Sequence, residues 1–242
     1  MDRETYDNMA RIDGAHWWFV ARRRIIDRLI RAQVPLKSDA RILEMGCGTG
    51  SNIALLGQFG AVDAVEPDGP ARALATARTG IEVKGGLLPD GVDLADGAYD
   101  MIAMLDVLEH IPDDGPALAA LLPKLAPGGR IVVTVPAGPG LWSAHDTAHH
   151  HQRRYTAGSL REVFEANGYR VRHLTHFNTV LYPLVVAARA AGRLMKREGG
   201  DDAMPPAPVN AVLKALFGAE RYWVPRRTLP FGVSLAIVAE PA

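Results

Sequence analysis

The sequence has almost no cysteine and no long hydrophobic segment. Cys47 is the only cysteine among the 242 residues, which excludes a disulfide within the chain and is typical of a reducing compartment. The longest apolar stretch, residues 180–191, is interrupted by Pro183 and Arg189, so it falls short of the roughly 20 residues that a transmembrane helix needs. The N-terminal segment is polar and does not resemble a signal peptide. We therefore expect a cytoplasmic protein.

An excess of charge of one sign is also missing. Lysine and arginine number 27, and so do aspartate and glutamate, so the whole chain has no net attraction for nucleic acid or an anionic membrane. We expect no nucleic-acid partner, and peripheral contact with a membrane would have to depend on a local basic patch. The composition does not indicate an oligomeric state.

Hydrophobic residues make up 48% of the chain, which is enough for one α/β domain with additions. From residue 41 onward, short apolar runs alternate with amphipathic segments, which favours a parallel sheet covered by helices on both faces. The last strand follows a helix, a strand and an insertion, and this order predicts a seventh strand that enters antiparallel. We predict one or two helices within 5–33, strands over 41–45, 62–66, 81–84, 99–105, 130–135, 169–177 and 232–239, helices over 50–59, 70–78, 115–125 and 157–167, and a turn at 127–129.

The same pattern divides the chain into three parts. Residues 1–40 form an N-terminal helical lid, and residues 41–178 with 229–242 form the core. Residues 179–228 form an insertion with an apolar helix followed by a stretch rich in proline and glycine. We interpret the insertion as a cap over an acceptor pocket. The alternative is that its apolar stripe and arginines lie at a membrane interface.

A glycine-rich loop is the strongest local signal. Gly46, Gly48 and Gly50 follow the predicted strand 41–45, and glycine there lets the backbone approach a ligand closely. The spacing G-x-G-x-G differs from the G-x-G-x-x-G of dinucleotide sites, which disfavours an NAD-dependent oxidoreductase. Glu44 would repel a pyrophosphate but suits a cationic amino group.

A second acidic residue, Glu66, ends the next predicted strand and is placed to accept hydrogen bonds from ribose hydroxyls. With the glycine loop, it resembles the first two motifs of class I S-adenosylmethionine-dependent methyltransferases, which have a Rossmann-like α/β fold. The resemblance implies S-adenosylmethionine as cofactor. It also implies that Glu66 binds the ribose, that Gly46 and Gly48 lie under the cofactor, and that Asp106 faces its methionine moiety. Further matching stretches lie in the same order at 99–102, 105–111 and 125–131.

An aromatic and arginine-rich segment, residues 16–24, precedes the core. It resembles the N-terminal helix of bacterial methyltransferases related to the ubiquinone-biosynthesis O-methyltransferases, in which an arginine pairs with the cofactor carboxylate. Arg22 is the first choice by its spacing to Ile26, and Arg23 is the second, because consecutive helical positions point about 100° apart. The alternative is a helix packed on the core with a solvated arginine run.

Four histidines occur within seven residues, 145–151, in a loop after the fifth predicted strand. Ligands of open α/β sheets bind at this end of the strands, so we interpret the loop as a source of acid–base chemistry. His145 and His149 are the leading candidates for a catalytic base, and His110 is the third. The alternative is a polar surface loop held by arginine–carboxylate pairs. The segment resembles a histidine- and arginine-containing pattern of methyltransferases associated with glycans, lipid-linked intermediates or secondary metabolites.

A bound metal ion is the alternative to a histidine base for activating an acceptor. Asp106, Glu109 and His110 resemble the metal-linked E-x-x-E-H pattern of some ubiquinone O-methyltransferases, with aspartate in place of the first glutamate. That replacement favours a site without a metal, which is our prediction.

The sequence thus predicts O-methylation of a small-molecule, glycan or lipid-linked acceptor, with a histidine as general base. The motif of enzymes that methylate amino groups of nucleic-acid bases is missing after the fourth predicted strand, where residues 106–109 read Asp-Val-Leu-Glu. The alternatives are a non-catalytic protein that binds S-adenosylmethionine and, less favoured, the NAD-dependent oxidoreductase.

Overall fold

The computed structural model describes residues 3–194 and 203–242. Their strands are β1 (Arg41–Met45), β2 (Ala61–Val65), β3 (Val83–Lys84), β4 (Tyr99–Leu105), β5 (Leu125–Pro136), β6 (Tyr169–Phe177) and β7 (Ser234–Pro241). They form one sheet in the order β3-β2-β1-β4-β5-β7-β6. β1 to β5 pair in parallel, and β7 lies antiparallel between β5 and β6. The predicted Rossmann-like sheet with an antiparallel last strand is confirmed.

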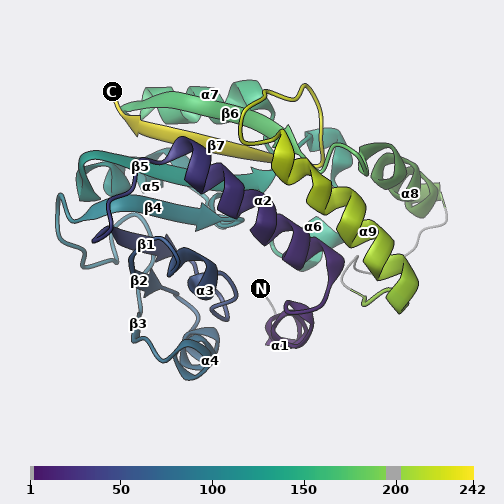
Figure 1. The fold of residues 1–242 in the computed structure, drawn as a ribbon, viewed down its shortest axis with the longest axis horizontal. Coiled ribbons are helices and arrows are strands. Elements are labelled where there is room, and N and C mark those ends of the chain that lie inside the picture. The colour runs from purple at the N-terminus through teal and green to yellow at the C-terminus, as the bar shows by residue number, and fades with distance from the viewer. Residues whose placement is uncertain (1–2, 195–202) are drawn as a thin grey trace.

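Helices cover both faces of this sheet (Figure 1). They are α1 (Arg3–Ile12), α2 (Trp17–Gln33), α3 (Ile53–Leu56), α4 (Gly69–Thr79), α5 (Asp114–Leu121), α6 (Ala144–Ala148), α7 (Ala157–Ala166), α8 (Tyr182–Leu194) and α9 (Ala207–Ala219). One apolar core joins the sheet to α5 and α7, and another joins its opposite face to α2 and α9. The sheet is therefore the middle of three layers.

The sequence of α2 explains its position on the sheet. His16 precedes the helix, and its Nδ1 accepts a hydrogen bond from the backbone N–H of Trp18. Ile25, Ile26 and Leu29 recur at helical spacing and are buried against strand residues. This amphipathic face packs the helix on the sheet. The N-terminal turns of the helix share a cavity with the glycine-rich loop after β1.

Several element predictions need correction. The helix expected over 50–59 is the short α3, because Gly57 and Gly60 flank turns rather than helix. The turn expected at 127–129 lies within β5, where Gly128 has a φ of 80° and the register with β4 shifts. α9 replaces part of the expected proline- and glycine-rich stretch, and residues 195–202 of that stretch lie outside the described residues.

The described helices of the flanking segments bear on the predicted three-part division. α1 and α2 fall within residues 1–40, α8 and α9 fall within 179–228, and every strand belongs to the two core segments. The division into lid, core and cap stays a prediction. In the part of the chain that the structure describes, no helix combines the length and apolar character needed to cross a membrane.

Candidate active site

The carboxyl ends of β1, β2, β4 and β5 meet at one edge of the sheet, where a cavity of about 1410 Å³ opens. Open α/β sheets bind their ligands at this edge. Side chains from α1, α2, α8 and α9 complete its walls. Eight of the residues that the sequence predicts line this cavity: Arg22, Gly46, Gly48, Glu66, Asp106, His110, His145 and His149. Glu44 and Gly50 lie outside its lining.

The glycine loop after β1 has left-handed backbone at each of its three glycines. A Cβ on Gly46 would lie 2.7 Å from a methyl group of Val107, so only glycine fits there. A Cβ on Gly48 would meet the ring of Tyr6 at 3.8 Å, which is an ordinary van der Waals distance. A Cβ on Gly50 would come within 3.3 Å of Ala75 in α4. Gly46 and Gly48 thus bring backbone to the cavity, whereas Gly50 packs against a helix.

Glu66 follows β2 and lies beside this loop. Its carboxylate accepts hydrogen bonds from the backbone N–H of Gly48 at 2.7 Å and of Asp68 at 2.9 Å. Burial raises the pKa of Glu66, and the two N–H groups oppose that rise. Tyr6 of α1 reaches the same carboxylate, and burial followed by the charge of Glu66 raises the pKa of its hydroxyl. The sequence analysis missed Tyr6, because nothing in its neighbourhood marks it as a site residue.

Glu44 lies in β1 below the glycine loop and is buried. Asn52 donates a hydrogen bond to its Oε1 at 3.1 Å. Burial raises the pKa of Glu44 to about 7, although the hydrogen bond from Asn52 opposes the rise. Glu44 is therefore hydrogen-bonded to Asn52, just after the glycine loop, and does not line the cavity.

Arg22 joins α2 to the end of β4 and β5. Its guanidinium lies 2.7 Å from a carboxylate oxygen of Asp106 and donates a hydrogen bond to the hydroxyl of Thr134 at 2.8 Å. It also stacks 5.0 Å from the ring centroid of Trp18. Arg23 points elsewhere and donates to the backbone carbonyl of Asp13. The structure thus brings only the first of the two candidate arginines into the lining of the cavity.

Asp106 has an unusual backbone at the end of β4. Its φ is 61°, which aspartate adopts more readily than most residues. Its other carboxylate oxygen accepts a hydrogen bond from Thr134 at 3.0 Å. Arg22 and Asp106 therefore present a positive and a negative group side by side in the cavity, a pair that matches the carboxylate and ammonium of an amino-acid moiety.

The loop after β5 is organised around Asp146, which is fully buried in α6. Its Oδ1 lies 2.9 Å from Nδ1 of His151 and 2.7 Å from Nε of Arg154. Burial alone would raise the pKa of Asp146, but the hydrogen bonds from His151 and Arg154 hold it well below its usual value. Because an ionised carboxylate only accepts hydrogen bonds, Nδ1 of His151 donates to Asp146, and its Nε2 lies 4.0 Å from Oε1 of Glu109.

His151 lines the cavity and was missed by the sequence analysis. The signal available in the sequence was the short separation between His151 and Asp146. Asp146 lies in the first turn of a short helix, and the chain after that helix turns back onto its carboxylate. His145 and His149 lie close by, with ring centroids 6.1 Å and 5.9 Å from that of His151. Burial, followed by the charges of His151 and His149, lowers the pKa of His110 to about 4. His110 is therefore a weak base at neutral pH.

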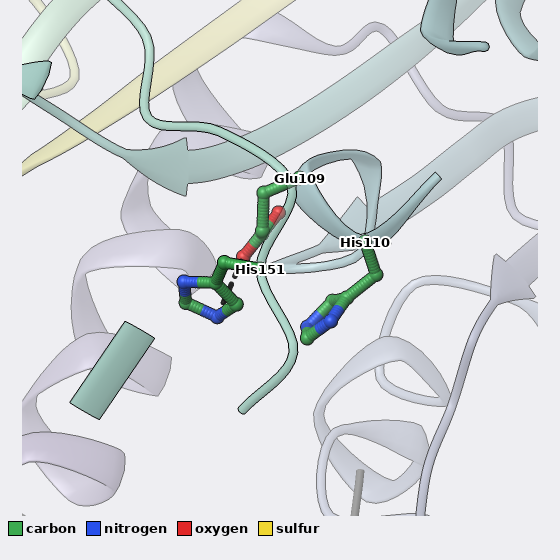
Figure 2. A group of neighbouring side chains, drawn as sticks. All are labelled: Glu109, His110 and His151. Atoms are coloured by element: carbon green, nitrogen blue, oxygen red, sulfur yellow. Dashed lines mark ion pairs between the residues drawn. The ribbon is translucent and has the colours of Figure 1, made fainter. Parts of the chain in front are cut away.

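Glu109 and His151 point toward each other, and the ring of His110 lies beside them (Figure 2). Glu109 is fully buried, and within the described part of the chain neither of its carboxylate oxygens has a hydrogen-bond partner. Burial and then the charge of Asp106 raise the pKa of Glu109 well above its usual value. One ligand atom from each of the three residues lies within 4.8 Å of the others, so the group could hold a metal ion. Asp106, which the sequence pattern suggested beside them, is instead paired with Arg22.

Comparisons with known proteins agree with this architecture. A family described as a methyltransferase domain matches residues 17–174. The trans-aconitate 2-methyltransferase of Deinococcus radiodurans is 32% identical over 55% of this chain and 50% of its own length. A ubiquinone biosynthesis O-methyltransferase of a Caulobacter species is 35% identical over 38% of this chain and 39% of its own. The chain thus spans about half or less of the length of these curated relatives.

A solved structure shares the fold over most of its length. The S-adenosylmethionine-dependent methyltransferase of Mesorhizobium loti aligns with a TM-score of 0.58 and 16% sequence identity. The alignment covers 87% of this chain and 94% of that one.

Proposed function

The chain belongs to the S-adenosylmethionine-dependent methyltransferases, and on that premise we propose that it methylates an oxygen acceptor with His151 as general base. The observation that carries the proposal is the pairing of His151 with the buried carboxylate of Asp146 at the wall of the cavity. The sequence favoured His145, His149 and His110 instead. The contact with Asp146 orients the ring of His151 and favours the tautomer with its proton on Nδ1, which leaves Nε2 as the atom that can take a proton.

The residues at the other end of the cavity fit the cofactor. Gly48 and Glu66 both line the cavity, so a ligand can lie against the glycine backbone and its ribose hydroxyls can donate to the Glu66 carboxylate. Arg22 and Asp106 would hold the carboxylate and ammonium of the methionine end. With the cofactor held in this way, its sulfur would lie between the glycine loop and the histidines.

Methyl transfer to a hydroxyl requires the protein to remove a proton. Bound S-adenosylmethionine supplies a methyl group on positively charged sulfur, so transfer to a hydroxyl leaves a neutral thioether and one proton to remove. His151 takes that proton on Nε2, and Asp146 stabilises the resulting imidazolium through its hydrogen bond to Nδ1. The low pKa of Asp146 keeps it ionised throughout, so the proton stays on the histidine until water accepts it.

The test is methyl transfer from labelled S-adenosylmethionine to a panel of phenols and to a cell extract. We expect His151→Gln to lower the rate by about 10²- to 10⁴-fold, the usual contribution of a general base, with unchanged affinity for the cofactor. His150→Asn is the matched control, because His150 is exposed in the same loop and asparagine accepts its φ of 57°. Full activity of His151→Gln would contradict the assignment. Cofactor binding without transfer to any fraction of the extract would favour the non-catalytic alternative.

One observation favours a second mechanism at the same place: neither oxygen of buried Glu109 accepts a hydrogen bond within the described residues, and Oε1 lies 4.0 Å from Nε2 of His151. With His110 and His151, Glu109 would offer one oxygen and two nitrogen ligands to a divalent cation, which lowers the pKa of a bound hydroxyl. Zinc titration of the wild type and of Glu109→Gln, with activity measured after chelation, separates this device from the metal-free one. Loss of activity on chelation that zinc restores would contradict our prediction of a site without a metal.

A further inference from the structure

α1 lies to one side of the sheet and contributes to the cavity rather than to the apolar cores (Figure 1). None of its described residues belongs to either core of the sheet, and Ile12, at its last position, is the only buried residue among 5–12. Tyr6 and Met9 line the cavity, and the ring of Tyr6 is the nearest group to a Cβ built on Gly48. α1 therefore faces the glycine loop with little apolar packing to hold it there.

Polar contacts hold the end of α1 instead. Asp13 directly follows the helix and is buried. Its two carboxylate oxygens accept hydrogen bonds from Nη2 of Arg78 at 3.1 and 2.9 Å. Its backbone carbonyl accepts another from Arg23 of α2. A buried carboxylate is strongly destabilising without a partner, so the position of Asp13 depends on Arg78.

The same guanidinium binds the glycine loop. Arg78 lies in the last turn of α4, and its Nη1 donates to the carbonyl and to the hydroxyl of Thr49, at 3.2 and 3.1 Å. Thr49 lies between Gly48 and Gly50 and lines the cavity. The donors of a guanidinium lie in one rigid plane, so these contacts fix the end of α1, α4 and the loop relative to one another. We call the contacts of Arg78 with Asp13 and Thr49 the Arg78 bridge.

The Arg78 bridge differs from the exposed ion pairs of this chain. The side chain of Asp13 is 8% exposed and that of Arg78 is 32% exposed, so solvent screens the pair only in part. Asp27 and Arg31 on α2 are paired at the same 2.9 Å, but their side chains are 23% and 48% exposed. Exposed pairs contribute little to stability. Breaking the bridge should therefore loosen α1, whereas breaking the pair on α2 should change little.

We propose that Arg78 is a positioning residue for the cofactor: it holds α1 against the glycine loop and thereby slows the release of S-adenosylmethionine and of the product S-adenosylhomocysteine. This inference rests on the cofactor site of the proposed function, because it takes the bound cofactor to lie along Gly48, where Tyr6 and Met9 cover it. It depends neither on His151 nor on the methyl acceptor. Loosening α1 uncovers the bound cofactor, so the effect belongs in the dissociation rate.

The test measures association and dissociation of S-adenosylhomocysteine with the full chain by stopped-flow tryptophan fluorescence, since Trp17 and Trp18 line the cavity. Asp13→Asn removes the charge that Arg78 pairs with and keeps the shape of the side chain. We expect its dissociation rate constant to rise about tenfold, the effect of losing a hydrogen bond to a charged group, with less than a twofold change in association. The matched control is Asp27→Asn, which removes an exposed ion pair and should change neither rate.

Two further variants examine Arg78 itself. Arg78→Gln should raise the dissociation rate constant as Asp13→Asn does, and the double variant should dissociate no faster than either single variant, because both remove the same interaction. Arg78→Lys keeps a positive charge beside Asp13 but lacks the planar fork that also reaches Thr49. It is the milder variant, whose folding is least at risk, and it should raise the dissociation rate constant by a smaller factor.

Hydrogen exchange of the backbone amides shows whether the variants act on α1. We expect the amides of α1 to exchange faster in Asp13→Asn and Arg78→Lys, with those of α2 unchanged. Unchanged dissociation in a variant whose α1 amides exchange faster overturns the proposal, and so does a rise in Asp27→Asn equal to that in Asp13→Asn. Equal rises in association and dissociation that leave the affinity unchanged overturn it as well, because α1 would then block the path without covering the cofactor. Failure of the His151 assignment alters none of these outcomes, since no methyl transfer is measured.

Discussion

Glu44 makes the stability of this fold depend on pH in the direction opposite to that of a salt-bridged carboxylate. Burial raises its pKa from 4.5 to about 7. Between those values the folded protein holds a proton that the unfolded chain has released, so the free energy of unfolding falls as the pH rises. At 1.36 kcal/mol per pKa unit, this interval corresponds to about 3 kcal/mol, most of which is lost between pH 5 and pH 8.

Substitution of Glu44 by glutamine isolates this contribution. The amide oxygen of Glu44→Gln can still accept the hydrogen bond from Asn52, but the side chain has no proton to release. We expect urea unfolding to show that wild-type protein loses roughly 2–3 kcal/mol more than the variant between pH 5 and pH 8. Glu162→Gln, at an exposed position of α7, is the control and should follow the wild type. An equal loss in wild type and Glu44→Gln would refute the reasoning.

Three further predictions concern the cofactor end, each measured by calorimetric titration with S-adenosylmethionine. Glu66→Gln should bind the cofactor about 1–3 kcal/mol more weakly, the cost of a lost hydrogen bond to a charged group, and unchanged affinity in the folded variant would remove Glu66 from the ribose site. Arg22→Lys should lose about tenfold or more in affinity because lysine lacks the planar fork, whereas Arg23→Lys should bind normally, and equal effects would contradict our choice between them. Gly48→Val should abolish binding, since valine tolerates a φ of 54° poorly and its side chain would enter the cavity that the loop lines, and retained binding would count against the loop assignment.

The sheet could be predicted from the sequence because its strands are buried. β1, β4 and β5 read as short apolar runs, and runs of this length separated by turns have few alternatives in an α/β chain. α9 could not be predicted with the same rules. Its sequence begins directly after a proline pair, and we read those prolines as loop, although proline in the first turn also starts helices.

The sequence predicts where Gly46, Gly48 and Glu66 lie in the fold more directly than where His151 lies, for a physical reason. Gly46, Gly48 and Glu66 are fixed by the ends of neighbouring parallel strands, so their positions follow once the strands are known. His151 depends on how an irregular loop folds around the buried carboxylate of Asp146. No periodicity encodes that contact, and the four nearby histidines look alike in the sequence.

The place of β7 in the sheet has a consequence for synthesis of the chain. β7 leaves the ribosome after β5 and β6, yet it lies between them and pairs with one edge of each. While the 56 residues between β6 and β7 are being made, a nascent chain has two unpaired strand edges for several seconds at about 5–20 residues per second. Those edges are sites where two nascent chains can join or where a chaperone can bind. Synthesis of the eight residues of β7 thus determines when these two edges are covered.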